Sequence, residues 1–369
     1  MPMLYNTVST LGMSRRLQTS LGELQVEMMR RNDELASGKH FDVAEQLGAR
    51  TGQAISLRNL HSETDEYLKT ASLLDGRLTT MDSAMASILK SGNDLLASAA
   101  TGLGQPSPTG SALQNGARGV LDQIVGLLNA SSGDGYLFGG VEVKQPPMRH
   151  AAGDGSALRA PIDIVRDAMA AAAGGTPAPD SPAETAAIVA VLADLFAVRD
   201  PGTPAPAPLT DTFEGGFYLG ATAMKPGGAA NPRLTARADG AAEIPYGVQA
   251  NDPMFRDLLQ GLYMLATIDT SALPLDAYQP YMQAAVDKLG AGLNGLRDAT
   301  AQLGIQRARL DEIQEQHKAR LTILAGQINA LEEVDPAEAS VRLNQLEVQI
   351  EMTSNATARI SRLSLANYL

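Results

Sequence analysis

Residues 289–331 read LGAGLNGLRDATAQLGIQRARLDEIQEQHKARLTILAGQINAL, and this stretch decides the fold. Steps of four and three residues alternate through it without a break, and nine of the thirteen positions they reach are apolar. The nine are Leu289, Leu293, Leu296, Leu303, Leu310, Leu321, Leu324, Ile328 and Leu331. A repeat of 3.5 residues is typical of a left-handed coiled coil. Because ordinary helices average about 11–12 residues, the stretch predicts a long helix that pairs with another helix along its length.

A second helix is predicted to start just after this stretch. In residues 335–338, Asp-Pro-Ala-Glu, the aspartate suits the N-cap, the proline the first helical position and the glutamate a capping box. The helix that follows carries a weaker apolar stripe of Leu343, Leu346, Ile350 and Ile360, in which Thr353 and Thr357 replace leucines, and Leu365 lies near its end. The acidic residues around the break, Glu332, Glu333, Asp335 and Glu338, are interpreted as capping and solvated groups.

The N-terminal region shows the same spacing. Its apolar positions are Leu4, Val8, Leu11, Leu17, Leu21, Leu24, Met28 and Leu35. Gly38 suits the C′ position, just after the last turn of such a helix. Two further helices are predicted before residue 140, one on each side of a Pro/Gly break at 104–110. The two ends of the chain therefore share one character, and we expect them to pair.

The middle of the chain differs from both ends. Residues 141–275 hold 15 of the 20 prolines. Ser181-Pro182-Ala183-Glu184 predicts a helix start, and Asp239-Gly240 predicts the turn of a hairpin. This insert is expected to form a small α/β or mostly β knob.

The expected fold is therefore mainly α, a long antiparallel coiled-coil rod of N- and C-terminal helices with an inserted knob. We divide it into terminal helices (1–37 plus 335–369, inner and assembly-dependent), a helical rod domain (38–140 plus 276–334) and a Pro/Gly-rich outer domain (141–275).

Composition excludes several classes of function. A formal net charge of −12 repels phosphate backbones, so no nucleic-acid partner is expected. The chain has no cysteine, which excludes disulfides, thiolate zinc sites and cysteine nucleophiles, and its four histidines show no metal-ligand spacing. No cofactor, metal or catalytic site is expected, and the protein is predicted not to be an enzyme. The chain has no run of 18 apolar residues, so no membrane insertion is expected. The first residues lack the apolar block of a secretory signal.

The apolar stripes suit either an intramolecular bundle or an assembly of copies. They extend close to both termini, where ordinary domains fray. A two-helix pair also covers only one side of each helix, which leaves positions such as Met3, Met29 and Leu363 for neighbours. These two points favour assembly.

Five segments carry a family resemblance. They are Glu34–Lys39 (ELASGK), Tyr136–Gly140 (YLFGG), Leu303-Gly304 followed by Arg307 and Leu310, Val334–Ala339 (VDPAEA) and Ser364–Leu369 (SLANYL). Together they resemble the bacterial flagellar axial proteins, the flagellin and hook-associated group. The YLFGG and SLANYL segments are more similar to the hook–filament junction type (hook-associated protein 3) than to flagellin. The loop after Gly38, residues 40–46, departs from the family pattern because it lacks an Asp-Asp pair.

The resemblance implies a structural role in the bacterial flagellum. In this family the two terminal regions pair, assemble helically into a tube, and fold on assembly. It implies an extracellular location after export without a cleaved signal peptide. The implied partners are copies of the chain in a helical ring, the hook-side junction protein, flagellin and an export chaperone. The expected function is the hook–filament junction. Flagellin, the filament subunit, is the alternative, and a soluble signalling coiled coil is a more distant one.

Overall fold

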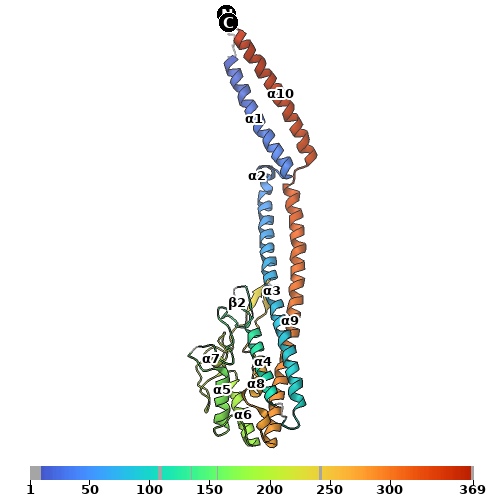
Figure 1. The fold of residues 1–369 in the computed structure, drawn as a ribbon. Helices are drawn as coiled ribbons and strands as arrows, with labels where there is room; N and C mark the ends of the chain where they lie inside the picture. The colour runs from blue at the N-terminus through green and yellow to red at the C-terminus, as the bar shows by residue number, and fades with distance from the viewer. Residues whose placement is uncertain (1–9, 107–109, 134, 156, 241–242, 367–369) are drawn as a thin grey trace. The chain divides into compact units, whose positions relative to one another are not determined.

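The computed structural model describes residues 10–106, 110–133, 135–155, 157–240 and 243–366, with the side chains of Thr10, Leu11, Ser14 and 361–366 left undescribed. Helices dominate these ranges, and the only strands within them form two small antiparallel pairs (Figure 1). The chain divides into two compact units, which are described separately. The terminal unit comprises residues 1–66 and 317–369, and the body unit comprises residues 67–316. The predicted mainly α fold is confirmed.

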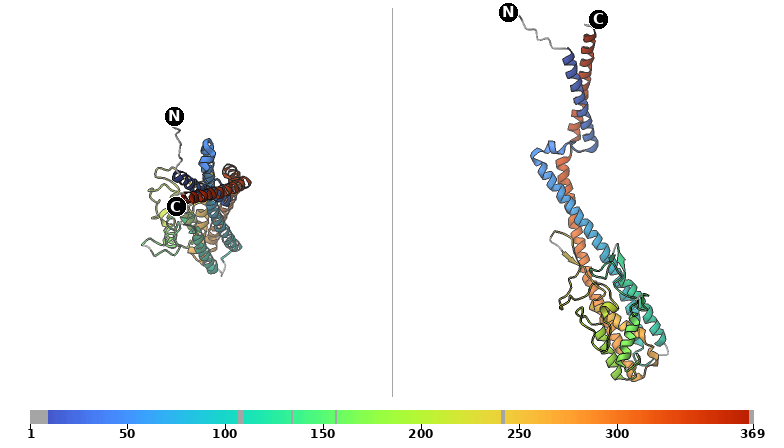
Figure 2. Two further views of the ribbon diagram at one scale, coloured as in Figure 1. Left: turned by 90° about the horizontal axis from the view of Figure 1, so that it is seen from above. Right: turned by 90° about the vertical axis from the view of Figure 1, so that its left-hand side faces the viewer.

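The terminal unit is built around two long helices. These are α1 (Thr10–Ser37) and α10 (Pro336–Ala366), which lie side by side and run in opposite directions (Figures 1 and 2). The unit also contains α2 (Val43–Leu47), η1 (Gly48–Arg50), the start of α3 (Thr51–Thr101) and the end of α9 (Leu275–Glu332). The antiparallel pairing that the sequence predicts for the terminal helices is therefore present.

Local residues set the ends of these helices. Gly38 follows α1 with φ +70°, a left-handed conformation that glycine adopts at little cost. Asp335 precedes α10, and its Oδ1 accepts a hydrogen bond from the amide of Ala337 at 2.8 Å. The predicted capping box is wrong in one respect, because Glu338 pairs with Arg342 one turn along the helix at 2.6 Å.

The body unit contains the main hydrophobic core. Its helices are the remainder of α3 and α9 together with α4 (Gly110–Leu128), α5 (Pro161–Ala172), α6 (Pro182–Leu195), the short α7 (Phe213–Gly216), α8 (Pro253–Thr267) and η2 (Thr270–Ala272). The α3 face of Leu78, Met81, Met85 and Ile88 is buried in one cluster with the α9 seam of Leu289, Leu293, Leu296, Leu303 and Leu310.

Two glycines allow the long helices to approach closely. A Cβ at Gly92 of α3 would lie 2.6 Å from Leu293 Cδ2, and one at Gly292 of α9 would lie 2.5 Å from the backbone nitrogen of Leu258 in α8. A side chain at Gly292 would force α9 and α8 apart, whereas one at Gly92 would displace the end of the Leu293 side chain.

The insert is an α/β knob rather than a mostly β one. It contains α5, α6, α7 and α8 together with β3 (Thr235–Arg237) and β4 (Glu243–Pro245), which pair antiparallel. The predicted hairpin is present, but Arg237 pairs with Glu243, a register that does not fit the predicted type I′ turn of two residues at Asp239-Gly240. The predicted cap of α6 is confirmed, because Ser181 Oγ accepts a hydrogen bond from the Glu184 amide at 3.3 Å. The other pair, β1 (Ser131–Ser132) with β2 (Gly135–Tyr136), lies at the end of α4, before the insert.

Candidate assembly surface

The seam between α1 and α10 is only half covered. The predicted positions that line it are all partly exposed: Leu17, Leu21, Leu24 and Met28 on α1, and Leu343, Leu346, Ile350 and Ile360 on α10. Two paired helices shield only one side of each other, so the apolar area that they bury is small. The pair therefore lacks the closed core that the body unit has.

The other predicted seam positions fall into three groups. In the end of α9, Leu324 is buried, whereas Leu321, Ile328 and Leu331 are partly exposed. Leu35 departs from the pattern, because it is exposed on the last turn of α1. Leu4 and Val8 lie outside the described residues, as do the side chains of Leu11 and Leu365.

A second apolar stripe runs along α10. It consists of Val341, Val348 and Met352, which are 56%, 49% and 65% exposed and are not among the predicted seam positions. At 100° per residue these three positions lie on the side of α10 opposite Leu343, Leu346 and Ile350. They border a shallow groove with the uncharged side chains of Asn344, Gln345 and Gln349. We call this surface the outer stripe.

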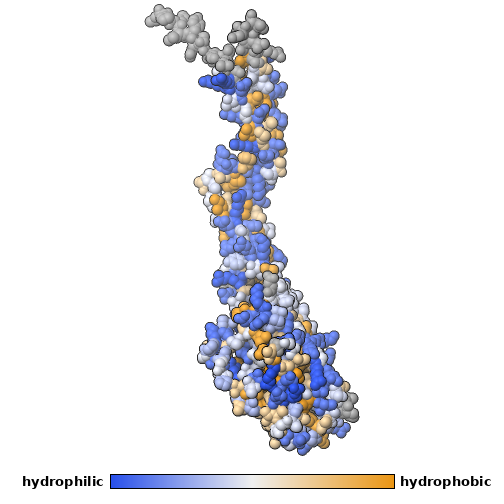
Figure 3. Space-filling model, turned by 60° about the vertical axis from the view of Figure 1, so that its left-hand side comes forward, coloured by the Kyte–Doolittle hydropathy of each residue, from blue (hydrophilic) through white to orange (hydrophobic). Residues whose placement is uncertain are grey.

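Apolar side chains are also exposed on α1. Val26 and Met29 reach solvent, and Met29 was one of the positions predicted to be left for a neighbour. Figure 3 shows hydrophobic side chains at the surface of this unit, interspersed with hydrophilic ones. A stripe of this kind on a helix is a common contact surface for another helix.

A short backbone bridge joins the loop after α1 to the break between α9 and α10. The amide of His40 donates to the carbonyl of Glu332 at 3.0 Å, and the amide of Val334 donates to the carbonyl of Gly38 at 3.1 Å. Lys39 and Glu333 thus form an antiparallel β-bridge. We call residues 38–40 and 332–334 the clasp.

Glu332 is a buried carboxylate at the centre of the clasp. Its side chain is 1% exposed. Arg58 Nε of α3 donates to Oε1 at 2.6 Å, and Lys39 Nζ donates to Oε2 at 3.2 Å. The hydrogen bond from Arg58 is the largest influence on its pKa, and together with Lys39 it holds the pKa of Glu332 below the ordinary value.

Glu34 is a second buried carboxylate beside the clasp. It accepts a hydrogen bond from the amide of Phe41 at 3.0 Å and one from Arg31 at 2.6 Å, and His40 Nδ1 lies 3.8 Å away. Burial alone would raise its pKa, but the Phe41 amide and the Arg31 guanidinium outweigh burial and lower the pKa.

The interpretation of Glu332 as a solvated group was wrong. Asp335 does cap a helix, but Glu332 is buried and paired with Arg58 and Lys39. For Glu34 a local signal exists, since Arg31 stands three residues earlier in the apolar stripe. For Glu332 the sequence offers no such signal, because both of its partners are more than 250 residues away.

The YLFGG segment anchors the insert to the helical body. The carbonyl of Phe138 accepts a hydrogen bond from the amide of Ala250, and the carbonyl of Gly139 accepts one from Ala221, both at 2.9 Å. Gly140 has φ +66°, and a Cβ there would lie 2.5 Å from the Gln249 side-chain amide. Of this segment only Tyr136 belongs to a strand, as the last residue of β2 (Gly135–Tyr136).

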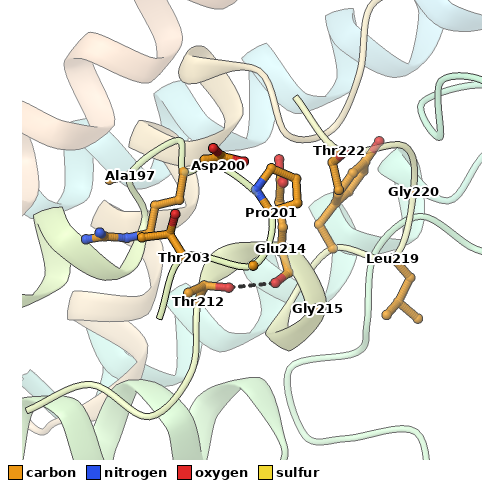
Figure 4. Close-up of a pocket in the computed structure, with 13 residues that line it drawn as sticks. Ala197, Asp200, Pro201, Thr203, Thr212, Glu214, Gly215, Leu219, Gly220 and Thr222 are labelled. Atoms are coloured by element: carbon orange, nitrogen blue, oxygen red, sulfur yellow. Dashed lines mark hydrogen bonds between the residues drawn. The ribbon is translucent and has the colours of Figure 1, made fainter. Parts of the chain in front are cut away.

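A hollow of about 380 Å³ in the knob does not form a second candidate site (Figure 4). Asp200 already accepts a hydrogen bond from the Gly227 amide at 3.0 Å, and Glu214 is paired with Arg256 at 2.8 Å. The hydroxyl of Thr212 donates to the backbone carbonyl of Glu214 at 2.7 Å. The acidic groups of the hollow thus hold loops together.

In the described ranges no group of three or more His, Asp or Glu side chains is placed to hold a metal ion. No helix within those ranges is both long and apolar enough to span a membrane.

Comparison with known families matches both ends of the chain. Residues 8–142 match the bacterial flagellin N-terminal helical region, and residues 286–369 match the bacterial flagellin C-terminal helical region. The two matches together cover more than half of the chain, and residues 143–285 lie between them. No match is found among curated proteins.

Proposed function

Because the chain belongs to the bacterial flagellin family, we propose that this structural flagellar axial protein forms the junction between hook and filament. Members of this family assemble into the axial structure of the flagellum. The finer assignment to the junction rests on the YLFGG and SLANYL segments, which resemble the junction type more than flagellin.

The observation that carries the assembly role is the exposure of the α1–α10 pair. Its seam is half covered, and α10 presents the uncharged outer stripe on its opposite side. A helix with two opposed apolar faces suits packing between two neighbours, one of which is α1 of its own chain. Copies in a helical lattice make contacts between two different surfaces, which this arrangement provides.

In this proposal each part of the chain has a place in the flagellum. Residues 1–37 and 335–369 form an inner tube, residues 38–140 and 276–334 form the next layer, and the 141–275 insert faces outward or contacts the hook side. The chain meets copies of itself in a ring, the hook-side junction protein on one side and flagellin on the other. It leaves the cell without a cleaved signal peptide, and a chaperone covers its apolar faces before export.

Electron microscopy of cells that lack the protein tests the junction role. The proposal requires hooks without filaments and flagellin shed into the medium, with filaments restored by the full chain. Normal filaments in the deletion strain would exclude it.

Flagellin is the alternative, favoured by the two family matches as strongly as the junction role. Purified protein that grows into long fibres on filament seeds would identify the filament subunit. Protein that caps the seeds without elongation would support the junction.

A further inference from the structure

The clasp occupies the place that a short loop has in an ordinary helical hairpin. Antiparallel helices are usually joined by a few residues, which fix how far one helix is shifted along the other. In the α1–α10 pair no such loop exists, because Lys39 and Glu332 are 293 residues apart in the sequence. The two backbone hydrogen bonds of the clasp take its place.

The helix seam alone specifies this shift weakly. Its leucines are only half-buried, and Thr353 and Thr357 replace leucines in the second half of α10. A heptad stripe of this kind accommodates a displacement by one repeat with little loss of contact. A unique feature outside the repeat is needed to select one register.

Glu332 supplies such a feature. Three segments meet at its carboxylate: the loop after α1 through Lys39, the start of α3 through Arg58, and the end of α9 itself. A buried carboxylate is tolerated only where its hydrogen-bond partners are in place, and a shifted arrangement would take Lys39 away from Oε2 and leave Arg58 as its one charged partner among these.

We propose that Glu332 is a positioning residue for assembly, which sets the register of the α1–α10 pair by holding the clasp closed. The role in assembly rests on the proposed function. The closure of the clasp by Glu332 is tested independently of that function.

The neighbouring residue provides a matched control. Glu333 is of the same type and lies in the same bridge, but its side chain is exposed. Glu332→Gln removes the buried charge, whereas Glu333→Gln removes a solvated one. Hydrogen exchange on the full chain measures the protection of the His40 and Val334 amides, which donate the clasp hydrogen bonds.

We expect protection of both amides in the unchanged chain and in Glu333→Gln. In Glu332→Gln their exchange should be about tenfold faster or more, as expected for the loss of a charge-assisted hydrogen bond. Amides of α4 and α8 in the body unit should keep their protection, which excludes global unfolding. Unprotected clasp amides in the unchanged chain, or equal protection in Glu332→Gln, would overturn the proposal.

The variant Arg58→Gln tests whether Glu332 acts through its hydrogen bond with Arg58 or only by packing. Arg58 is 54% exposed, so its replacement leaves no cavity. We expect it to accelerate exchange at the same two amides, and the double variant to exchange no faster than Glu332→Gln alone. Additive effects would show that the two residues act separately and would refute the shared clasp.

The role of Glu332 in assembly is tested by expressing the variants in cells that lack the protein. The unchanged chain and Glu333→Gln should restore filaments, whereas Glu332→Gln should be found in the medium instead of in the flagella. Filaments restored equally by Glu332→Gln would overturn its role in assembly. If the unchanged chain restores none, the proposed function fails, while the exchange data still decide whether the clasp exists.

Discussion

The two units carry the same spacing of apolar residues but bury it to different extents. In the body unit, Leu289, Leu293 and Leu296 of α9 are fully buried. In the terminal unit, Leu343, Leu346 and Ile350 of α10 are only partly buried. The body unit has α4, α8 and the insert to complete its core, whereas α1 packs along α10. A heptad stripe therefore predicts that a helix has a partner, and the remaining exposure shows where a further partner is needed.

The largest expected effect concerns the body unit and tests its closed core. Leu310 is fully buried, so Leu310→Asp places an unpaired charge in the core and should lower the free energy of unfolding by more than about 3 kcal/mol. Urea unfolding of the purified chain measures this loss. Ile305→Asp, on an exposed position of the same helix, should change stability little. Equal losses in both variants would contradict the difference in burial.

A smaller loss of stability is expected from a substitution where α9 packs closely against α8 in the same unit. Gly292→Ala places a methyl group against the α8 backbone and should cost about 1–3 kcal/mol. Gly290→Ala, in the same helix but with open space around its Cβ, should instead stabilise by about 0.5–1 kcal/mol. Thermal unfolding of the two variants should therefore shift in opposite directions, and a shift in the same direction would show that the close contact with Leu258 is absent.

In the terminal unit, a charge on the outer stripe should impair assembly into flagella and leave the stability of the purified chain unchanged. Val348→Asp puts a charge on the outer stripe and should leave urea unfolding unchanged while preventing incorporation into flagella. Ser354→Asp, exposed on α10 but away from that stripe, serves as its control. Incorporation is measured by immunoblotting of isolated flagella. Normal incorporation of Val348→Asp would show that the outer stripe contacts no neighbour.

The smallest effect is a pH dependence confined to the terminal unit. Glu34 and Glu332 both have a pKa lowered from the ordinary value of 4.5. A lowered folded-state pKa stabilises the fold above the unfolded value, and this contribution is lost as pH falls below about 4.5 and through the folded-state pKa. The groups that face the carboxylates are Arg31, Lys39, His40 and Arg58.

Hydrogen exchange compared between pH 6 and pH 3 and corrected for the intrinsic rates measures this dependence. The clasp amides should lose protection progressively as the pH falls from 4.5 to 3, whereas the amides of α8 should not. Constant protection of the clasp would mean that the two carboxylates contribute nothing to its closure.

Local signals in the sequence predicted much of the fold. The 3.5-residue repeat gave α9 and α10, Gly38 marked the end of α1, and Ser181 marked the start of α6. Each of these depends on residues within a few positions of one another, where the physical cause is visible in the sequence itself.

The remaining features depend on distant residues. The same repeat gave no indication that Leu310 is fully buried while Leu346 is not, because burial depends on which other helices pack there. Nothing near Glu332 pointed to Arg58, and Leu35 continues the α1 pattern yet is exposed. The outer stripe was readable from its spacing of seven and four residues, but the stronger stripe on the opposite face of α10 masked it.

The clasp also imposes an order of events during synthesis. The ribosome delivers α1 before any other described helix, whereas its partner α10 follows only after α9 is made. The nascent chain thus contains α1 but not α10 at a stage when all helices of the body unit have been made. Contacts between residues so remote in sequence close slowly, and the clasp cannot form before residue 334 has been made.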